Sequence, residues 1–195
     1  ITAYADRLLN DLDELEWSDS VKEAQRHWIG RSEGAIVQFP LAEDTGKHVE
    51  VFTTRPDTLH GVAFMVLAPE HDLVQTLTSD DQHDAVEAYV HQASMKSERD
   101  RQGDKTISGV FTGGHVTHPV TGESIPVWIA DYVLAGYGTG AIMAVPAGDE
   151  RDWKFAKHFD LDIPNIFEGH DTDEAVCTDK GAILKGCGDW DGQTA

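Results

Sequence analysis

Apolar residues recur at helical spacing in several stretches of the chain and predict helices there. In residues 1–15 such a residue returns every three or four positions, at Ile1, Tyr4, Leu8, Leu12 and Leu15. Ser18-Asp19-Ser20 then offers an N-cap for a second helix over 21–28, which Gly30 ends. Residues 80–97 and 149–159 show the same periodicity. The pattern therefore predicts a helical start and two further helices much later in the chain.

Short β-branched or apolar runs predict strands between these helices. They cover residues 35–39, 48–54, 62–67, 109–111, 115–118, 125–134 and 141–145. The run 62–67 is apolar throughout, so we expect a strand that is buried on both faces. The segment Thr112-Gly113-Gly114 is expected to separate two of the strands. Strands with several turns and a few helices indicate an α+β domain built on a sheet or a barrel.

The two ends of the chain look like cuts in a longer sequence. Position 1 is Ile, and residues 186–195 hold three glycines without hydrophobic periodicity. We therefore expect a segment of a longer protein. The alternative is a complete chain from which the initiator methionine has been removed.

Composition and charge narrow the classes of function. The chain has 195 residues, with 35 Asp and Glu against 15 Lys and Arg, and its net charge is −20. That excess argues against an autonomous nucleic-acid binder and against docking on an anionic membrane. No apolar run approaches the ~18 residues of a membrane-spanning helix. Two cysteines, Cys177 and Cys187, suggest neither a metal cluster nor a secreted disulfide framework, so a reduced cytosolic protein is expected.

The segment 53–58, Thr-Thr-Arg-Pro-Asp-Thr, is the first candidate for chemistry. Pro56 fixes its own φ and biases Arg55 toward extended geometry, so the strand should turn sharply here. The turn would place three threonine hydroxyls on one rim, where they could hold a water and a carbonyl oxygen. The alternative is a purely structural turn, in which Asp57 and Thr58 bond nearby backbone.

The second candidate is the glycine-rich segment 136–140, which leads through an apolar strand into 149–152. It lacks the Gly-Lys-Ser/Thr ending of a phosphate loop, so we reject that interpretation. Asp149 and Asp152 would share one face in the first turn of a helix. They could cap that helix, or Asp152 could bind a cation such as an amino group. Since no metal motif and no Gly-x-Ser-x-Gly elbow occurs, any hydrolysis is expected to use a positioned water.

Together these segments resemble a known family. Residues 51–61 resemble the threonine-rich peptide of the editing domain in class I aminoacyl-tRNA synthetases. Asp57 after the proline, and the stretch 138–152, resemble the leucyl branch, because valyl and isoleucyl relatives carry other residues at these places. Residues 27–34 are similar to the passage from the synthetic domain into this insertion, also called connective peptide 1. The resemblance covers nearly the whole chain.

The resemblance implies an architecture and an activity. It implies a helical segment over 1–33 that enters from the synthetic domain, an editing core over 34–166 and a return connection over 167–195. The core would be a β-barrel with peripheral helices. It would hydrolyse tRNA-Leu mischarged with norvaline, isoleucine or similar amino acids, since one methylene is worth only ~1–3 kcal/mol at the synthetic site. Its partners would be the 3′-terminal aminoacyl-adenosine and the rest of a monomeric, cytoplasmic synthetase. No cofactor or metal is expected here, and ATP and Mg²⁺ would belong to the synthetic domain.

The resemblance also assigns roles to residues. Thr53 and Thr54 would position the ester carbonyl or the attacking water, and Asp152 would hold the α-ammonium of the substrate. Thr58 would crowd the pocket against the γ-branched leucine side chain, and Arg55 would meet the tRNA 3′ end.

Further residues would complete the pocket. Asp149 would assist at the adenosine or amino end, and the walls would come from Leu134, Tyr137, Met143 and Val145. Gly148 stands where many relatives have His, so we leave position 148 out of the site.

Two alternatives remain open at this point. The first is a degenerate editing fold that only docks the tRNA 3′ end; the intact threonine peptide and Asp152 argue against it. The second is an editing domain of valine or isoleucine specificity. In every case the acidity excludes independent tRNA binding but leaves the 3′ end of tRNA as a substrate.

Overall fold

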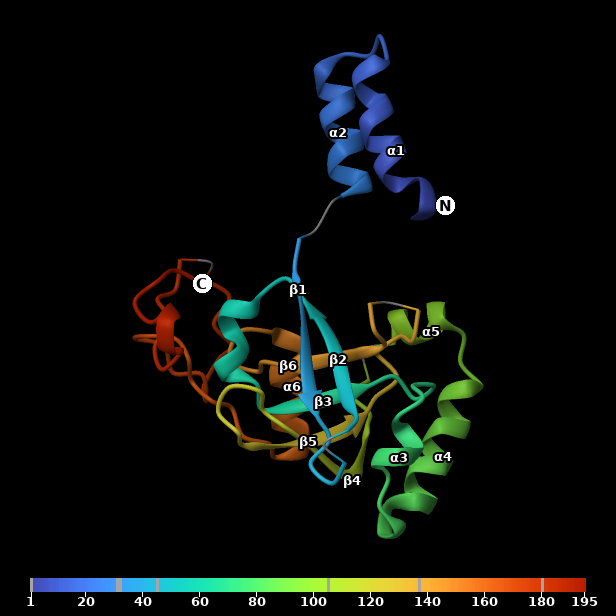
Figure 1. Cartoon of the computed structure of the whole chain (residues 1–195), viewed down its shortest axis with the longest axis vertical. Helices are drawn as coiled ribbons and strands as arrows, with labels where there is room; N and C mark the ends of the chain where they lie inside the picture. The colour runs from blue at the N-terminus through green and yellow to red at the C-terminus, as the bar shows by residue number, and fades with distance from the viewer. Residues whose placement is uncertain (1, 31–32, 45, 105, 137, 180) are drawn as a thin grey trace. The chain divides into compact units, whose positions relative to one another are not determined.

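The computed structural model describes residues 2–30, 33–44, 46–104, 106–136, 138–179 and 181–195 (Figure 1). The chain divides into two compact units, Ile1–Glu33 and Gly34–Ala195. Each unit has its own internal contacts and is described by itself.

The first unit is a pair of short helices. The 3₁₀ turn η1 (Thr2–Tyr4), α1 (Ala5–Asn10) and the 3₁₀ turn η2 (Asp11–Glu14) precede α2 (Asp19–Ile29). The continuous helix expected over 1–15 is therefore wrong: the α-helix ends at Asn10. Asp11, Asp13 and Glu14 follow directly, and carboxylates are unfavourable at the C-terminal end of a helix dipole. The second helix is confirmed, and Gly30 ends it with a φ of 65°.

Two sheets form the centre of the second unit. One has the order β4 (Val110–Thr117), β5 (Ser124–Ile129), β3 (Phe64–Leu67) and β6 (Ala141–Ala144). In it β3 pairs with β5 in parallel, while the other neighbours are antiparallel. The other sheet pairs β1 (Ala35–Pro40) with β2 (His48–Thr53). Every residue of β3 is buried, which confirms the prediction of a strand covered on both faces.

The two sheets contact each other at two places. In the first place, β2 lies against β6. In the second, the amide of Ala42, just past the end of β1, donates a hydrogen bond of 3.0 Å to the carbonyl of His115 in β4. The mixed α+β class is thus observed. Within the described ranges the strand ladders do not close into a ring, so the barrel stays a prediction.

Helices surround the sheets in two groups. After β3 come α3 (Val74–Leu77), the 3₁₀ turn η4 (Asp80–Gln82), α4 (His83–Ser94) and α5 (Glu98–Gly103); α6 (Glu150–Phe159) follows β6, and a last 3₁₀ turn, η5, spans Gly188–Trp190. The helix expected over 80–97 therefore stops at Ser94. A new helix starts because the Ser97 hydroxyl accepts a hydrogen bond of 3.2 Å from the Asp100 amide.

Two strand predictions also need correction. Residues 112–114 do not separate two strands, because β4 runs through them with a bulge between Phe111 and His115. Gly113 supports the bulge with a φ of 84°. β5 ends at Ile129 instead of Leu134. The buried Arg101 donates to the carbonyls of Asp131 and Val133 at 2.6 and 2.7 Å, which turns the chain out of the ladder.

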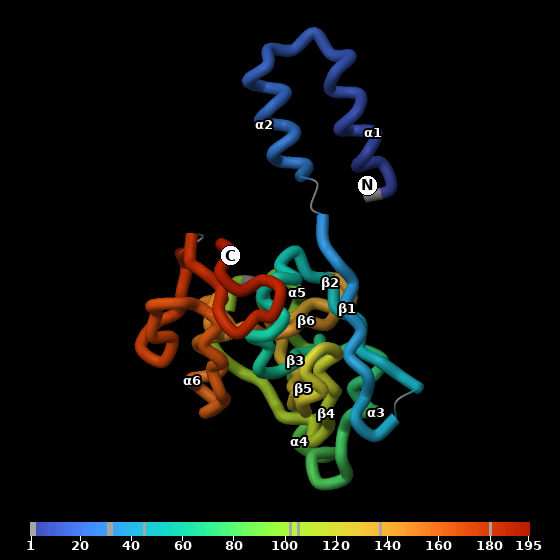
Figure 2. Tube along the Cα trace, turned by 60° about the vertical axis from the view of Figure 1, so that its left-hand side comes forward, coloured from blue at the N-terminus to red at the C-terminus, as the bar shows by residue number. Residues whose placement is uncertain are grey.

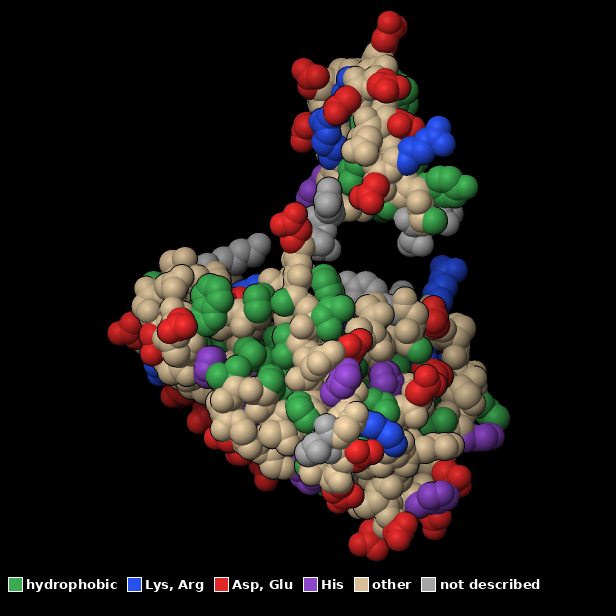
Figure 3. All heavy atoms as spheres, in the orientation of Figure 1, with side chains coloured by type: hydrophobic (Ala, Val, Ile, Leu, Met, Phe, Trp, Pro, Cys, Tyr) green, Lys and Arg blue, Asp and Glu red, His purple; other side chains and the backbone are tan. Residues whose placement is uncertain are grey.

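The C-terminal segment, residues 167–195, lies beside the start of α6 (Figure 2). The Trp153 indole donates to the Thr172 carbonyl at 2.8 Å, and the Cys177 amide donates to the Ala147 carbonyl at 2.9 Å. Acidic side chains are spread over the face of the molecule drawn in Figure 3. Among the described residues, no helix is long and apolar enough to cross a membrane.

Candidate functional site

The threonine-rich segment forms a turn whose hydroxyls bond its own backbone. β2 ends at Thr53, and Pro56 opens the 3₁₀ helix η3 (Pro56–Gly61). The Arg55 amide donates to the Thr53 hydroxyl at 3.0 Å, and the Thr58 hydroxyl donates to the Arg55 carbonyl at 2.9 Å. The structural role is therefore present in part: Thr58 bonds nearby backbone as that alternative expects, whereas Asp57 bonds the Arg55 side chain. It fixes where the threonine side chains stand.

Arg55 is held at the rim by Asp57. Its guanidinium donates from Nε and Nη2 to the two carboxylate oxygens, at 3.0 and 2.8 Å. The hydrogen bonds that Arg55 donates to Asp57 raise the pKa of Arg55 above its ordinary value. About half of the Arg55 side chain is exposed. The result is a positioned, solvent-facing cation at the end of β2.

The second segment places two carboxylates in different roles. Asp149 is the N-cap of α6 and accepts hydrogen bonds from the amides of Arg151 and Asp152 at 2.8 and 3.1 Å. Asp152 lies in the first turn but does not cap it. Its carboxylate accepts a hydrogen bond of 2.9 Å from the Val145 amide, just past the end of β6. Capping thus explains Asp149, while Asp152 joins the helix to the strand.

Burial sets the charge of Asp152. The residue is only 6% exposed. The pKa of Asp152 is raised to about 7: burial and, next, the Asp149 charge raise it, while the hydrogen bond from the Val145 amide lowers it. Near neutral pH this carboxyl group therefore exchanges between neutral and charged forms. A cation that enters the site would bind the charged form.

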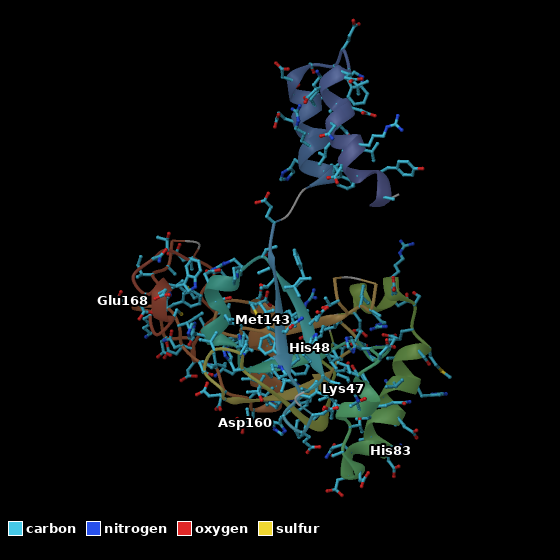
Figure 4. All side chains as sticks on the ribbon, viewed as in Figure 1. Lys47, His48, His83, Met143, Asp160 and Glu168 are labelled. Atoms are coloured by element: carbon cyan, nitrogen blue, oxygen red, sulfur yellow. The ribbon has the colours of Figure 1, made fainter. Side chains whose placement is uncertain are left out.

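These two segments meet at one cavity of about 350 Å³. Its lining includes seven of the predicted site residues: Thr53, Arg55, Thr58, Met143, Val145, Asp149 and Asp152. Met143, labelled in Figure 4, lines this cavity from β6. Because β2 lies against β6, residues at and just past the ends of both strands line the same cavity.

Two of the predicted residues that the structure describes are not part of this lining: Thr54 is exposed, and Leu134 is half-buried outside the cavity. Tyr137 falls outside the described residues.

The remaining wall comes from residues that sequence reasoning did not place. They are Gly148, Phe167, Cys177, Thr178, Asp179 and Ala195. A Cβ atom on Gly148 would lie 3.1 Å from the Phe167 ring, so the missing side chain leaves room for that ring. No motif marks this wall; the only signal is that Phe167 and Cys177 are apolar residues in a polar segment. Among the described side chains, no three His, Cys, Asp or Glu groups gather to hold a metal ion.

The fold and cavity therefore define an α+β domain in which Thr53 at the end of β2, Thr58 in η3 and the buried Asp152 of α6 line one cavity. Comparison with known proteins identifies that class. The family model for the leucyl-tRNA synthetase editing domain matches residues 26–193. The chain belongs to the family of leucyl-tRNA synthetase editing domains, which confirms the leucyl resemblance read from the motifs.

Two individual relatives agree with this family. The chain is 54% identical over 186 residues to the leucine–tRNA ligase of Christiangramia forsetii, a match that covers 94% of the chain and 19% of that protein. It also matches the crystal structure of a ternary complex of Agrobacterium radiobacter K84 agnB2 LeuRS, tRNA and LeuAMS. That match has a TM-score of 0.71 and 39% identity, and it covers 89% of the chain and 21% of the solved one. The chain thus spans about a fifth of each relative.

Proposed function

We propose that this domain proofreads by hydrolysing the ester bond of mischarged tRNA-Leu. Water attacks the ester carbonyl, the bond to the ribose oxygen breaks, and the products are a free amino acid and a tRNA 3′ hydroxyl. The observation that carries this proposal is the shared cavity, in which Thr53 and Thr58 face Asp152. Membership of the editing-domain family supports it.

Asp152 binds the α-ammonium group of the aminoacyl ester. The site is buried, so an ionised carboxylate without a partner is costly, and a cation relieves that cost. The pKa of Asp152, about 7 in the free domain, falls when the ammonium binds. Asp149 does not compete, because its Oδ1 is already held by two amides of α6. It assists at the adenosine end of the substrate.

Thr58 supplies the size limit of the pocket. Its hydroxyl is committed to the Arg55 carbonyl, and the residue is 6% exposed, so its side chain cannot move aside easily. Norvaline has an unbranched side chain, and isoleucine branches at Cβ, whereas leucine branches at Cγ. The fixed Thr58 excludes the γ-branch and leaves the correct ester intact. Met143 and Val145 line the same cavity. The family resemblance also assigns wall positions to Tyr137 and to Leu134, of which Leu134 does not line this cavity.

Thr53 and Thr54 position the water and the ester carbonyl. The Thr53 hydroxyl accepts from the Arg55 amide, which leaves its own proton free to donate. Such a donor stabilises the negative charge that develops on the carbonyl oxygen. Thr54 is exposed next to it and reachable by substrate. The Arg55 cation, fixed by Asp57, contacts the tRNA 3′ end.

Binding of the tRNA body belongs to the rest of the synthetase. The chain has a net charge of −20, and phosphate binding depends on clustered Lys and Arg. The solved relative is described as a complex with tRNA, which supports a tRNA substrate. We therefore propose that only the 3′-terminal aminoacyl-adenosine enters this domain, within a monomeric cytoplasmic enzyme.

We also infer that the two sheets are sides of one barrel-like core. The hydrogen bond from the Ala42 amide to the His115 carbonyl joins the end of β1 to β4, and β2 lies against β6. Hydrogen exchange tests this directly: slow exchange of the Ala42 amide, as in the paired amides of β4, supports a continuous wall. Rapid exchange of Ala42 would separate the two sheets.

Deacylation tests the proposed function. The complete synthetase is given tRNA-Leu charged with norvaline, isoleucine or leucine, and release of each amino acid is timed. We expect release of the first two and retention of leucine. Asp152→Ala should abolish the release, while Asp160→Asn, an exposed carboxylate at the end of the same helix, should leave it unchanged. Absence of release in the wild type would favour a domain that only docks the 3′ end.

A further inference from the structure

Tyr132 lies in the turn after β5 and is not part of the cavity lining. Its ring packs against the start of α6. The Arg151 guanidinium carbon lies 5.3 Å from the Tyr132 ring centroid, and the Phe155 ring centroid lies 5.9 Å from it. Arg151 and Phe155 are four residues apart on one helix face, and Asp152 belongs to the same turn. The ring is therefore held beside the turn that carries the buried carboxylate.

The hydroxyl of Tyr132 is buried without a protein partner. Among the described residues it makes no hydrogen bond of normal geometry. An unpartnered buried hydroxyl is destabilising, and a phenylalanine would pack the same ring without that cost. On the helix turn against which this ring packs, the buried acceptor is the carboxylate of Asp152, which among the described residues accepts a hydrogen bond only from the Val145 amide.

Several charges surround the Asp152 carboxylate. On its own helix, Asp149 opposes ionisation of Asp152 and Arg151 favours it. Across the cavity stand Arg55, which is bound to Asp57, and Asp179. The Val145 amide favours the charged form, because it donates a hydrogen bond to the carboxylate, and a hydrogen bond from the Tyr132 hydroxyl would favour that form in the same way.

We propose that Tyr132 is a positioning residue for the amino group of the substrate. Its hydroxyl donates a hydrogen bond to the Asp152 carboxylate and holds that group ionised and oriented toward the cavity. The phenol keeps its proton throughout. This assignment takes its substrate from the proposed function, but the interaction itself involves two groups of this chain alone. It can therefore be tested with and without catalysis.

The first test measures the carboxylate directly. Carbon-13 NMR of the 195-residue chain follows the Asp152 side chain against pH, with Asp152→Asn to assign the signal. In Tyr132→Phe the titration midpoint should rise by about one pH unit, the tenfold change typical of one lost hydrogen bond to a charged group. An unmoved midpoint overturns the proposal.

Tyr89 offers a matched control. Its hydroxyl is paired with the Ser108 hydroxyl at 2.8 Å and accepts from the Asp131 amide at 3.0 Å, away from the cavity lining. Tyr89→Phe removes the same atom from a satisfied position, so it should lower the melting temperature without moving the Asp152 midpoint. Tyr132→Phe should instead move the Asp152 midpoint without lowering the melting temperature. An equal midpoint shift in both variants would indicate a general effect of lost packing and would also overturn the proposal.

The second test uses the complete synthetase and tRNA-Leu charged with norvaline. Tyr132→Phe should lower kcat/KM about fivefold relative to the wild type near pH 7, and it should nearly match the wild type at about pH 9, where Asp152 ionises without help. A loss that is the same at every pH would reject the positioning role. If the wild type releases no norvaline while the NMR midpoint still moves, the proposed function fails but the pairing of Tyr132 with Asp152 stands.

Discussion

The carboxylate of Asp152 accepts a hydrogen bond of 2.9 Å from the backbone amide of Val145, so one buried group both joins α6 to β6 and faces the cavity. This relationship makes the site and the fold depend on the same atom. A residue that held the two elements together equally well, but carried no charge, could not bind an ammonium group. Variants of Asp152 separate the structural link between α6 and β6 from the binding of an ammonium group.

Replacement of Asp152 by Asn should stabilise the fold at neutral and alkaline pH. The pKa of Asp152 is raised from 3.8 to about 7, so the folded state binds this proton more tightly than the unfolded state. Stability from this group is therefore full below about pH 4 and is lost as pH rises toward 7, by roughly 4 kcal/mol in all. Asn keeps an acceptor for the Val145 amide and has no charge to bury.

Thermal unfolding at several pH values checks this. The melting temperature of the wild type should fall more steeply between about pH 5 and 8 than that of Asp152→Asn. Asp160→Asn, at an exposed helix end, should follow the wild-type curve. Parallel curves for all three proteins would show that Asp152 is not the group responsible.

The same pKa predicts the pH dependence of deacylation. Since the carboxylate must be ionised and the α-ammonium must keep its proton, kcat/KM should rise through about pH 7 and fall again above about pH 8, where an α-amino group loses its proton. Asp152→Asn should be inactive at every pH despite its greater stability. Initial rates on norvaline-charged tRNA-Leu measure this, and a flat profile in the wild type would remove Asp152 from ammonium binding.

Thr58→Ala should enlarge the pocket and admit the leucine ester. The change removes the hydrogen bond to the Arg55 carbonyl, which should cost about 1 kcal/mol of stability, and opens space for a γ-branch. Correctly charged leucyl-tRNA should then be hydrolysed by the complete synthetase. Thr58→Val is the matched control, because it loses the same hydroxyl but keeps the bulk. If both variants spare leucyl-tRNA, size exclusion by Thr58 is wrong.

Gly148→Ala should disturb the wall that sequence reasoning left out. The new Cβ atom would stand 3.1 Å from the Phe167 ring and press it away from the cavity. Such overpacking typically costs about 1–3 kcal/mol. The double variant Gly148→Ala, Phe167→Leu should recover part of the loss in melting temperature and in deacylation. Additive losses in a double-mutant cycle would show that the two positions do not interact.

Gly113→Ala should destabilise the domain without changing substrate choice. Gly113 has a φ of 84° in the β4 bulge, and a Cβ atom there would collide with Ser79. We expect a loss of more than about 1 kcal/mol by denaturant unfolding. The ratio of norvaline to leucine release should stay unchanged, because the bulge is not part of the cavity lining. Gly122→Ala, with a φ of 76° and no atom within 4 Å, isolates the backbone cost from the collision.

Local patterns predicted elements well where one physical preference dominated. The apolar run that became β3 is buried at every residue, and Gly30 ends α2 as expected. Predictions went wrong where a distant side chain intervened. Arg101 captures the carbonyls of Asp131 and Val133 and ends β5 early. No periodicity within residues 125–134 contains that information.

For the site, sequence and structure contributed different things. The sequence by itself determined the residue types, the sharp turn at Pro56, the acidity and the membership of the family, because these depend on order and composition alone. Only the tertiary structure decided which groups share a cavity, since β2 and β6 meet across the two sheets. It also decided that Asp149 caps a helix while Asp152 is buried, with its pKa raised to about 7. Burial is a property of the surrounding fold, and two aspartates three positions apart carry no sign of it.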